Sequence, residues 1–298
     1  MAAGPGSAEA FAQLLPPLGE TVRQWLREDI PSFDYGGAVV GDKPESMTLF
    51  CKSAGVLAGC PFFTAVFDEL GCTVEWKVPE GASLSPGPGE RIVVATVRGS
   101  ARRLLMGERT GLNVLCRASG IAARARRLVE IKEAQKWAGV VAGTRKITPG
   151  FRVVEKHAML VGGADTHRMD LSSMVMLKDN HIWSHGSITK AVTAARAVCG
   201  FSMKIEVETS SIEEAREAIT AGADVVMLDN FEPAALEEVA AALKKEWPHV
   251  MLEGSGGITE DTIASFMSPH IDVISTSSIH QGVPHVDFSL KVNRDAKM

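Results

Sequence analysis

The second half of the chain alternates short apolar runs with amphipathic helical segments, and this alternation constrains the fold more than any other feature. The apolar runs predict buried strands, and strands that alternate with helices form parallel sheets. About six such units fit either an α/β barrel or a doubly wound sheet, and periodicity does not choose between them. The predicted strands are 139–143, 174–178, 203–208, 224–229, 249–253 and 271–275, and the predicted helices are Thr189–Val198, Ser211–Ala221, Pro233–Trp247 and Thr259–Met267.

The first half of the chain has a different pattern. Short runs rich in β-branched residues are separated by turns rich in glycine and proline, which predicts a sheet with helices, an α+β domain. A last run, 286–292, alternates like a strand without a following helix, and we expect it to return to this first domain. The runs begin at Met47, Cys72 and Arg91, and the predicted helices cover 11–29, 61–70 and about 101–135.

Composition excludes several classes of protein. A hydrophobic share of 45% and a charged share of 22% are ordinary for a globular protein, and a net charge of −5 argues against general nucleic-acid binding. No apolar run is long enough for a bilayer, and residues 1–10 lack the regions of a signal peptide, so we expect a cytoplasmic protein without a membrane partner. The five cysteines show no CxxC pair and no zinc spacing, which predicts reduced, packed thiols.

Charged and small residues follow the predicted strands at their carboxyl ends. In parallel β/α folds these ends converge on one rim, where ligands bind. A single charged residue there has a structural explanation as an ion pair or a helix cap, but five successive strand ends do not. The residues are Arg145 and Lys146; Lys178, Asp179, Asn180 and His181; Glu206 and Glu208; Asp229 and Asn230; and Ser255, Gly256 and Gly257.

These residue types suit a phosphorylated, strongly anionic substrate. Adjacent Arg145 and Lys146 on a turn can hold an anion of more than one charge, although a solvated basic loop has the same sequence. The small residues 255–257 let backbone N–H groups approach a phosphate. This local signal is weak, but it is strengthened by its place after a late strand, because late strands of a β/α barrel often form phosphate sites. Glu208 and Asp229 suit a divalent cation such as Mg²⁺.

Two other functions remain open at this point. Lys178 at a strand end is compatible with a barrel aldolase or isomerase that forms a Schiff base with a carbonyl substrate. A non-catalytic phosphosugar-binding protein would carry a similar rim without turnover, although its site residues would have no reason to remain complete.

Taken together, the motifs resemble those of the quinolinate phosphoribosyltransferase family and occur in that family's order over about residues 105–277. The carrying motifs are Gly107-Glu108-Arg109 with Leu112-Asn113, Ala142 to Gly150, Val161-Gly162-Gly163, His167-Arg168, Lys178-Asp179-Asn180-His181, Glu206-Val207-Glu208, Leu228-Asp229-Asn230 and Ser255-Gly256-Gly257-Ile258.

The resemblance implies a two-domain type II phosphoribosyltransferase. An N-terminal α/β sandwich, residues 1–114, would be joined by the C-terminal segment 278–298, and an open α/β barrel with parallel strands would span 115–277. Such a pentosyltransferase transfers phosphoribosyl from 5-phosphoribosyl 1-pyrophosphate to quinolinate with Mg²⁺ as cofactor. The products are nicotinate mononucleotide, pyrophosphate and CO₂, in de novo NAD biosynthesis.

The resemblance also implies roles for single residues. Lys146, Lys178, Glu208 and Asp229 would be catalytic, and Glu208 and Asp229 would hold the metal. A homodimer would be the minimum unit, with Arg109 contributed across the interface, and a homohexamer occurs as a larger assembly. Enough cations for two carboxylates favour quinolinate over nicotinate. Quinolinate would contact Arg109, Arg145, His167, Arg168 and Lys178, and phosphoribosyl pyrophosphate would contact Lys146, Glu208, Asp229, Ser255, Gly256, Gly257 and Ser277.

One position departs from the family's pattern. The pattern predicts glycine at position 277, where a loop completes the phosphate pocket, and this chain has Ser277. A serine N–H and hydroxyl can still bind phosphate, but a serine with positive φ would be strained.

Overall fold

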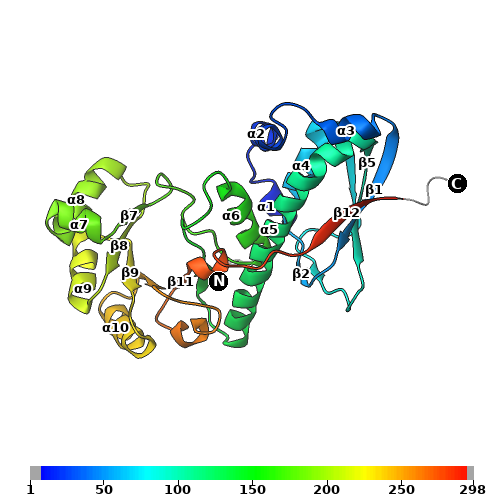
Figure 1. The fold of residues 1–298 in the computed structure, drawn as a ribbon. Helices are drawn as coiled ribbons and strands as arrows, with labels where there is room; N and C mark the ends of the chain where they lie inside the picture. Colours follow the sequence, from blue (N-terminus) through cyan, green and yellow to red (C-terminus); the bar gives the residue numbers. More distant parts are fainter. Residues whose placement is uncertain (1–7, 294–298) are drawn as a thin grey trace. The chain divides into compact units, whose positions relative to one another are not determined.

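A computed structural model describes residues 8–293 and divides them into two compact units (Figure 1). The barrel unit contains residues 127–147 and 164–281, and the N-terminal unit contains 8–126, 148–163 and 282–293. The predicted border between 114 and 115 falls inside a single long helix, α5 (Ala101–Ala134). The domain boundaries expected from the sequence stay a prediction.

The barrel unit is built on a six-stranded sheet in the order β6-β11-β10-β9-β8-β7, and all its pairs are parallel. The first strand, β6, pairs with the last, β11, as in a barrel, whereas a doubly wound sheet reverses its strand order in the middle. Because β6 and β7 are the two edges of the sheet, the barrel is open, and the predicted fold class is confirmed. The strands are β6 (Val140–Ala142), β7 (Val175–Leu177), β8 (Ile205–Thr209), β9 (Val225–Asp229), β10 (Met251–Ser255) and β11 (Val273–Ser275).

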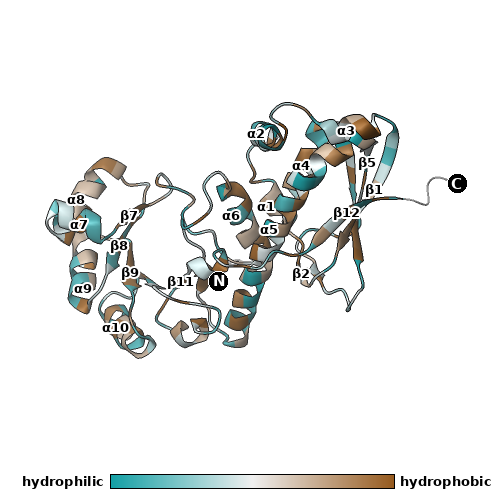
Figure 2. Ribbon diagram, viewed as in Figure 1, coloured by the Kyte–Doolittle hydropathy of each residue, from teal (hydrophilic) through white to brown (hydrophobic). Residues whose placement is uncertain are grey.

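Amphipathic helices follow β7, β8 and β9, and their ribbons carry both hydrophilic and hydrophobic residues (Figure 2). The side chains of Ser187 and Ser211 accept hydrogen bonds from the first-turn amides of α8 and α9, which satisfies amides that the helices leave unpaired. The prediction of a helix over Thr259–Met267 was wrong, since only the 3₁₀ turn η1 (Ile263–Phe266) forms. Thr262 Oγ1 accepts a hydrogen bond from the Thr259 amide, which favours a turn over a helix. The remaining helices are α7 (Asp179–His185), α8 (Ile188–Cys199), α9 (Ile212–Ala221) and α10 (Pro233–Glu246), of which α7 was not predicted.

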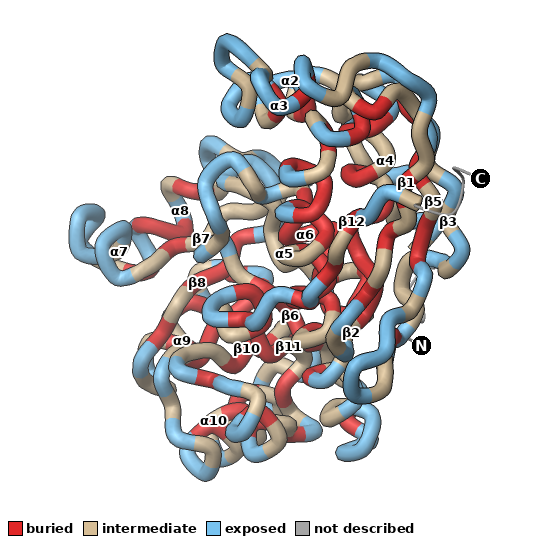
Figure 3. The backbone as a smooth tube through the Cα atoms, turned by 45° about the vertical axis from the view of Figure 1, so that its right-hand side comes forward, coloured by how far each residue is buried: buried red, intermediate tan, exposed pale blue. Residues whose placement is uncertain are grey.

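Apolar strand residues form the core of the barrel unit, and Figure 3 shows buried residues along the strands. Val207, Val226 and Leu252 are fully buried, and each such side chain contributes about 1.5–3 kcal/mol through burial. The polar residues of the same strands gather towards their carboxyl ends, so the apolar core positions the polar rim above it.

The N-terminal unit contains an antiparallel sheet in the order β12-β1-β5-β3. The last strand pairs with β1, so the expected return of the C-terminal run is confirmed. Leucines of α5 and phenylalanines of α4 pack with the sheet in one apolar cluster. The elements are α1 (Ala8–Ala12), α2 (Gly19–Asp29), α3 (Tyr35–Val40), β1 (Pro44–Cys51), β2 (Gly55–Val56), α4 (Cys60–Glu69), β3 (Thr73–Trp76), β4 (Ser83–Leu84), β5 (Ile92–Ser100), α6 (Arg152–Gly162) and β12 (Phe288–Val292), of which α3, α6, β2 and β4 were not predicted.

The five cysteines are free thiols, as expected, and Cys51, Cys60 and Cys72 are buried. None of the helices within residues 8–293 combines the length and the apolar character that a bilayer span requires.

Candidate active site

The carboxyl ends of the barrel strands carry most of the residues that the sequence singled out. Parallel pairing sets Ser255 of β10 beside Asp229 of β9, and Leu177 of β7 beside Val207 of β8. The residue that follows each strand therefore lies next to the polar carboxyl end of the neighbouring strand. Of the predicted substrate-binding residues, only Arg109 lies in the N-terminal unit, exposed on α5.

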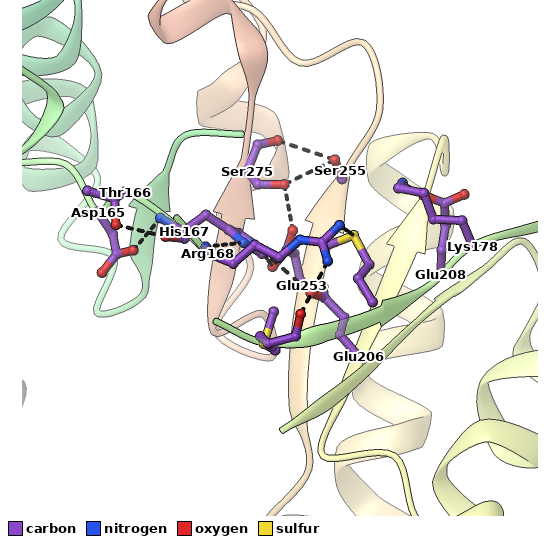
Figure 4. A network of polar contacts seen from close by, with 12 residues as sticks. Asp165, Thr166, His167, Arg168, Lys178, Glu206, Glu208, Glu253, Ser255 and Ser275 are labelled. Atoms are coloured by element: carbon purple, nitrogen blue, oxygen red, sulfur yellow. Dashed lines mark hydrogen bonds and ion pairs between the residues drawn. The ribbon is translucent and has the colours of Figure 1, made fainter. Parts of the chain in front are cut away.

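Lys178 and Glu208 form an ion pair at this rim (Figure 4). Lys178 is the residue before α7, and its Nζ bonds Glu208 Oε2 on the adjacent strand. The Lys178 side chain is 42% exposed and that of Glu208 is 17% exposed, so the pair remains open to a ligand. An exposed pair of this kind adds little stability, which leaves both charges available for binding.

Asp229 connects this pair to the next strand. Burial, followed by the charge of Glu208, raises the pKa of Asp229, while Lys178 and Lys146 act in the opposite direction. These four predicted residues are therefore close enough to influence one another. A divalent cation fits this donor set, because it would relieve the repulsion between the Glu208 and Asp229 carboxylates, and Mg²⁺ typically takes only one or two protein carboxylates beside phosphate oxygens.

Arg145 and Lys146 are exposed on the loop that follows β6. Within this loop, Thr144 Oγ1 accepts the Lys146 N–H at 3.1 Å, and Gln281 Nε2 donates to the Lys146 carbonyl at 3.0 Å. Thr144 Oγ1 also lies 3.1 Å from Nε2 of the buried His280. These bonds fix the backbone that carries the two cations while their side chains remain accessible.

His167 lies in a loop that a parallel bridge between Ala142 and Asp165 aligns against β6. Its backbone is left-handed, with a φ of 54°, and its N–H donates to Asp165 Oδ1 at 2.6 Å. Its Nδ1 accepts the Arg168 N–H at 2.8 Å, and its Nε2 lies 2.9 Å from Glu253 Oε2. Because the protein engages both ring nitrogens, a ligand contact through either nitrogen requires one of these bonds to break.

Arg168 is the more accessible partner for a substrate. Its guanidinium donates to the Met174 carbonyl at 3.2 Å and contacts Met176 Sδ at 3.5 Å. Burial and the nearby charge of Arg145 lower the pKa of Arg168. Two guanidinium groups that repel each other are an attractive site for a molecule with two carboxylates, because its negative charges offset the repulsion.

Two buried glutamates, Glu206 and Glu253, lie beneath these cations. The sequence placed Glu206 among the charged residues of the rim but assigned neither glutamate a role in binding or catalysis. Glu206 is fully buried, and as a carboxylate it finds no hydrogen-bond donor for either oxygen, with His167 Nε2 at 3.8 Å. Burial, and then the neighbouring Glu253, raise the pKa of Glu206 to about 9. Glu206 is therefore protonated at neutral pH. The only signal in the sequence was the position of Glu206 two residues from Glu208 on the same strand face.

The glycine loop after β10 packs against Asn230. Gly256 and Gly257 have φ values of 100° and 62°, and a Cβ on Gly256 would lie 2.3 Å from Asn230 Oδ1. Asn230 is itself left-handed, with a φ of 60°, and donates its N–H to the Ser255 carbonyl at 2.9 Å. Consecutive left-handed residues leave backbone N–H groups free to converge on an anion.

Ser277 begins the 3₁₀ turn η2 (Ser277–Ile279). The non-glycine residues with positive φ in the described chain are Lys136, His167 and Asn230, so Ser277 does not have the left-handed backbone that would strain a serine. The Ser278 N–H donates to Thr276 Oγ1 at 3.1 Å and caps this turn.

Comparisons with known proteins show the family of this chain. The family models for the N-terminal and C-terminal domains of quinolinate phosphoribosyl transferase match residues 34–119 and 121–291. Nicotinate-nucleotide pyrophosphorylase (carboxylating) of Dictyostelium discoideum is 51% identical over 297 residues, covering 95% of this chain and 99% of that protein. The human protein of the same name is 52% identical over 287 residues, covering 96% of this chain and 95% of that protein.

Solved structures show the same fold. NadC from Streptococcus pyogenes has a TM-score of 0.83 at 36% identity, covering 94% of this chain and 99% of that chain. The nicotinate-nucleotide pyrophosphorylase from Francisella tularensis has a TM-score of 0.84 at 30% identity, covering 94% and 98%. The chain belongs to the quinolinate phosphoribosyl transferase family.

Proposed function

We propose that this protein is a quinolinate phosphoribosyltransferase of de novo NAD biosynthesis. It transfers phosphoribosyl from 5-phosphoribosyl 1-pyrophosphate to quinolinate, with loss of CO₂, and forms nicotinate mononucleotide and pyrophosphate. The observation that carries the proposal is one rim with two adjacent groups of charges. Arg145 and Arg168 form the first group, and Lys146, Lys178, Glu208 and Asp229 form the second.

The first group, Arg145 and Arg168, suits quinolinate, which is a flat dicarboxylate. Arg145 and Arg168 each present a planar fork that can bind a carboxylate with two hydrogen bonds. Lys178 of the second group supplies a further cation, since its charge acts on Glu206 as well as on Asp229. We assign quinolinate binding to these three residues with His167, and with Arg109 from a second subunit.

The second group suits the reacting phosphoribosyl. As the bond to pyrophosphate breaks, the anomeric carbon becomes positive and the leaving group gains negative charge. The carboxylates of Glu208 and Asp229 stabilise the former, and the Lys146 ammonium stabilises the latter. The 5′-phosphate binds residues 255–257 and Ser277, where backbone N–H groups and hydroxyls are available.

Decarboxylation needs no covalent nucleophile. The ring nitrogen of quinolinate bonds to the anomeric carbon and becomes positive. As CO₂ leaves, the electron pair of the bond to the 2-carboxylate stays on ring carbon 2, where the adjacent positive nitrogen stabilises it, and a proton from water then takes the place of the carboxylate. Cations at the rim hold the dicarboxylate so that its ring nitrogen faces the ribose.

Glu208 and Asp229 would hold Mg²⁺ together with oxygens of the pyrophosphate. When bound, the metal would neutralise charge on the departing pyrophosphate. The Schiff-base alternative lacks support, because Lys178 is ion-paired with a carboxylate, whereas a catalytic amine is activated by an apolar pocket or a neighbouring cation.

Offering two acceptors in parallel tests this function. Purified protein with phosphoribosyl pyrophosphate and Mg²⁺ receives either quinolinate or nicotinate, and nicotinate mononucleotide is measured by chromatography. We expect product from quinolinate and none from nicotinate. Product from nicotinate alone would assign the chain to a nicotinate-using relative, and binding without turnover would make it a phosphosugar-binding protein.

We also propose that the active unit is at least a homodimer, with a homohexamer as a larger form. Arg109 is exposed on α5 and is the predicted quinolinate contact that belongs to the other compact unit. Mixing inactive Arg109→Ala and Lys178→Ala chains should restore part of the activity, because a mixed dimer contains one intact site. The absence of any recovery after subunit exchange would contradict a contribution from the neighbouring subunit.

The cellular location that we propose is the cytoplasm. Free cysteine thiols, three of them buried, suit a reducing compartment.

A further inference from the structure

A continuous chain of short polar contacts runs beneath the rim and passes through Glu253 (Figure 4). Glu253 lies on β10, between β9 and β11, and is 2% exposed. Its Oε2 lies 2.9 Å from His167 Nε2, and its Oε1 accepts the Ser275 hydroxyl at 2.5 Å. Each carboxylate oxygen therefore has a different partner, and the two partners belong to different parts of the site.

The contact to His167 controls the backbone of Arg168. Because His167 Nδ1 accepts the Arg168 N–H, the ring proton lies on Nε2 and is donated to Glu253. His167 also has a left-handed backbone, which persists only where the surroundings hold it. Glu253 thus fixes the ring that anchors the arginine of the dicarboxylate group.

The contact to Ser275 leads to the glycine loop. Because the single hydroxyl proton of Ser275 is donated to Glu253, the Ser255 hydroxyl is the donor to Ser275, whose Oγ lies at 3.1 Å and whose carbonyl oxygen lies at 3.4 Å. Ser275 is 2% exposed, so its hydroxyl cannot exchange these partners for water. Ser255 is the first residue of the loop that we assign to the 5′-phosphate.

We propose that Glu253 is a positioning residue that couples dicarboxylate binding at Arg168 to phosphate binding at the Ser255 loop. The inference rests on the function proposed above. A buried carboxylate accepts hydrogen bonds only, and each of its bonds is strong because it is charged. When one substrate fixes its own end of the chain, the carboxylate and its second partner are fixed as well, so the other site is preorganised.

His167, Glu206 and Glu253 also bring three possible metal-ligand atoms within 4.8 Å of one another. The hydrogen-bond pattern favours positioning, because Nε2 carries a proton and cannot bind a metal through the same nitrogen. The charge of Arg168 acts on both glutamates, which further disfavours a cation at this point.

A double-mutant cycle with Ser275→Ala and Glu253→Gln tests the coupling. Binding of quinolinate alone and of ribose 5-phosphate alone is measured by calorimetry. Ser275→Ala removes a contact on the phosphate side only, yet we expect it to weaken quinolinate binding about fivefold. In the Glu253→Gln background the same substitution should change quinolinate binding by less than about twofold, because the link is already broken.

Ser119→Ala is the matched control. Ser119 is a fully buried serine of the N-terminal unit whose hydroxyl donates to the Ala58 carbonyl at 3.1 Å, and its loss should leave quinolinate affinity unchanged. Glu253→Gln should weaken both ligands and raise both KM values more than it lowers kcat, since it changes binding geometry and leaves the reacting groups in place.

Wild-type affinity for quinolinate in Ser275→Ala would overturn the proposal, as would multiplicative effects of the two substitutions. The proposal would also be overturned if wild-type protein dialysed against zinc retained one zinc ion per chain and the Glu253→Gln variant did not. Wild-type protein that neither binds nor converts quinolinate would instead refute the proposed function. If Glu253→Gln fails to fold, as judged by thermal unfolding, Ser275→Ala decides the question alone.

Discussion

Glu206 and Glu208 are two residues apart on β8 and share one face of the strand, but their surroundings differ. Glu206 is fully buried and protonated, and as a carboxylate it has no hydrogen-bond donor. Glu208 is two residues nearer the carboxyl end of β8, partly exposed and paired with Lys178. The difference of about 7 Å along a strand is therefore enough to separate a group beneath the site from a group that can meet a substrate.

Removing Lys178, the ion-pair partner of Glu208, should have the largest effect on activity. Lys178→Ala leaves Glu208 unpaired and removes a cation from the dicarboxylate group, so kcat/KM should fall by about 10³-fold or more, roughly 4 kcal/mol. The rate of CO₂ release from quinolinate measures this effect. Lys190→Ala, an exposed lysine of α8, is the control and should retain wild-type activity. Equal activity in the two variants would place the chemistry elsewhere.

Changing each glutamate to glutamine tests directly whether Glu206 and Glu208 differ in role. Glu208→Gln removes a charge that we assign to the transition state, and kcat should fall by about 10²-fold. Glu206→Gln replaces a neutral acid with a neutral amide of the same shape, so kcat at pH 7 should change by less than about threefold. Similar losses in both variants would show that the two positions do not differ in role.

The dependence of stability on pH should distinguish the buried glutamate. The folded protein holds the Glu206 proton up to a pKa of about 9, whereas the unfolded chain releases it near 4.5. Unfolding releases a proton within this window, so the wild-type protein loses stability as pH rises, by at most about 1.4 kcal/mol per pH unit.

Glu206→Gln lacks this proton. Relative to the wild type, it should be about 2 kcal/mol or more stable at pH 8 and nearly equal at pH 4.5. Urea unfolding at several pH values measures the difference. Parallel stability profiles for the two proteins would contradict a protonated Glu206.

The smallest effect should come from Ser277→Gly, which restores the residue that the family pattern predicts. Because Ser277 does not have a positive φ, glycine relieves no strain and adds freedom to the unfolded chain, costing about 0.5–1 kcal/mol. The KM for phosphoribosyl pyrophosphate should change by less than about twofold, since the backbone N–H remains. A large gain in affinity would show that the serine side chain obstructs the phosphate loop.

The sequence predicted the barrel strands well because each contains a short run of buried apolar residues, with the polar residues placed mainly towards the carboxyl end. All six were found within two residues of their expected ends, and Ser211, where a helix was predicted to begin, is the N-cap of α9. Periodicity did not distinguish a barrel from an open doubly wound sheet, since that choice depends on which strands pair. The pairing of β6 with β11 decided it.

The charged rim was predictable because parallel strands bring their carboxyl ends together. The network beneath it was not, because Glu253 and Ser275 are far apart in sequence and ordinary in their local context. The turn at Thr259 was also misread, since a side-chain hydrogen bond there competes with the helix that the spacing suggested. The contact between Glu253 and Ser275, in contrast, exists only after β10 and β11 have paired.

We propose that this charged rim joins phosphoribosyl to quinolinate and removes its 2-carboxylate. Quinolinate labelled with ¹⁴C at that carboxyl tests it most directly, with purified protein, phosphoribosyl pyrophosphate and Mg²⁺. We expect labelled CO₂, pyrophosphate and nicotinate mononucleotide in equal amounts, and none of them when phosphoribosyl pyrophosphate is omitted. Unlabelled gas, or a nucleotide that keeps the label, would contradict it.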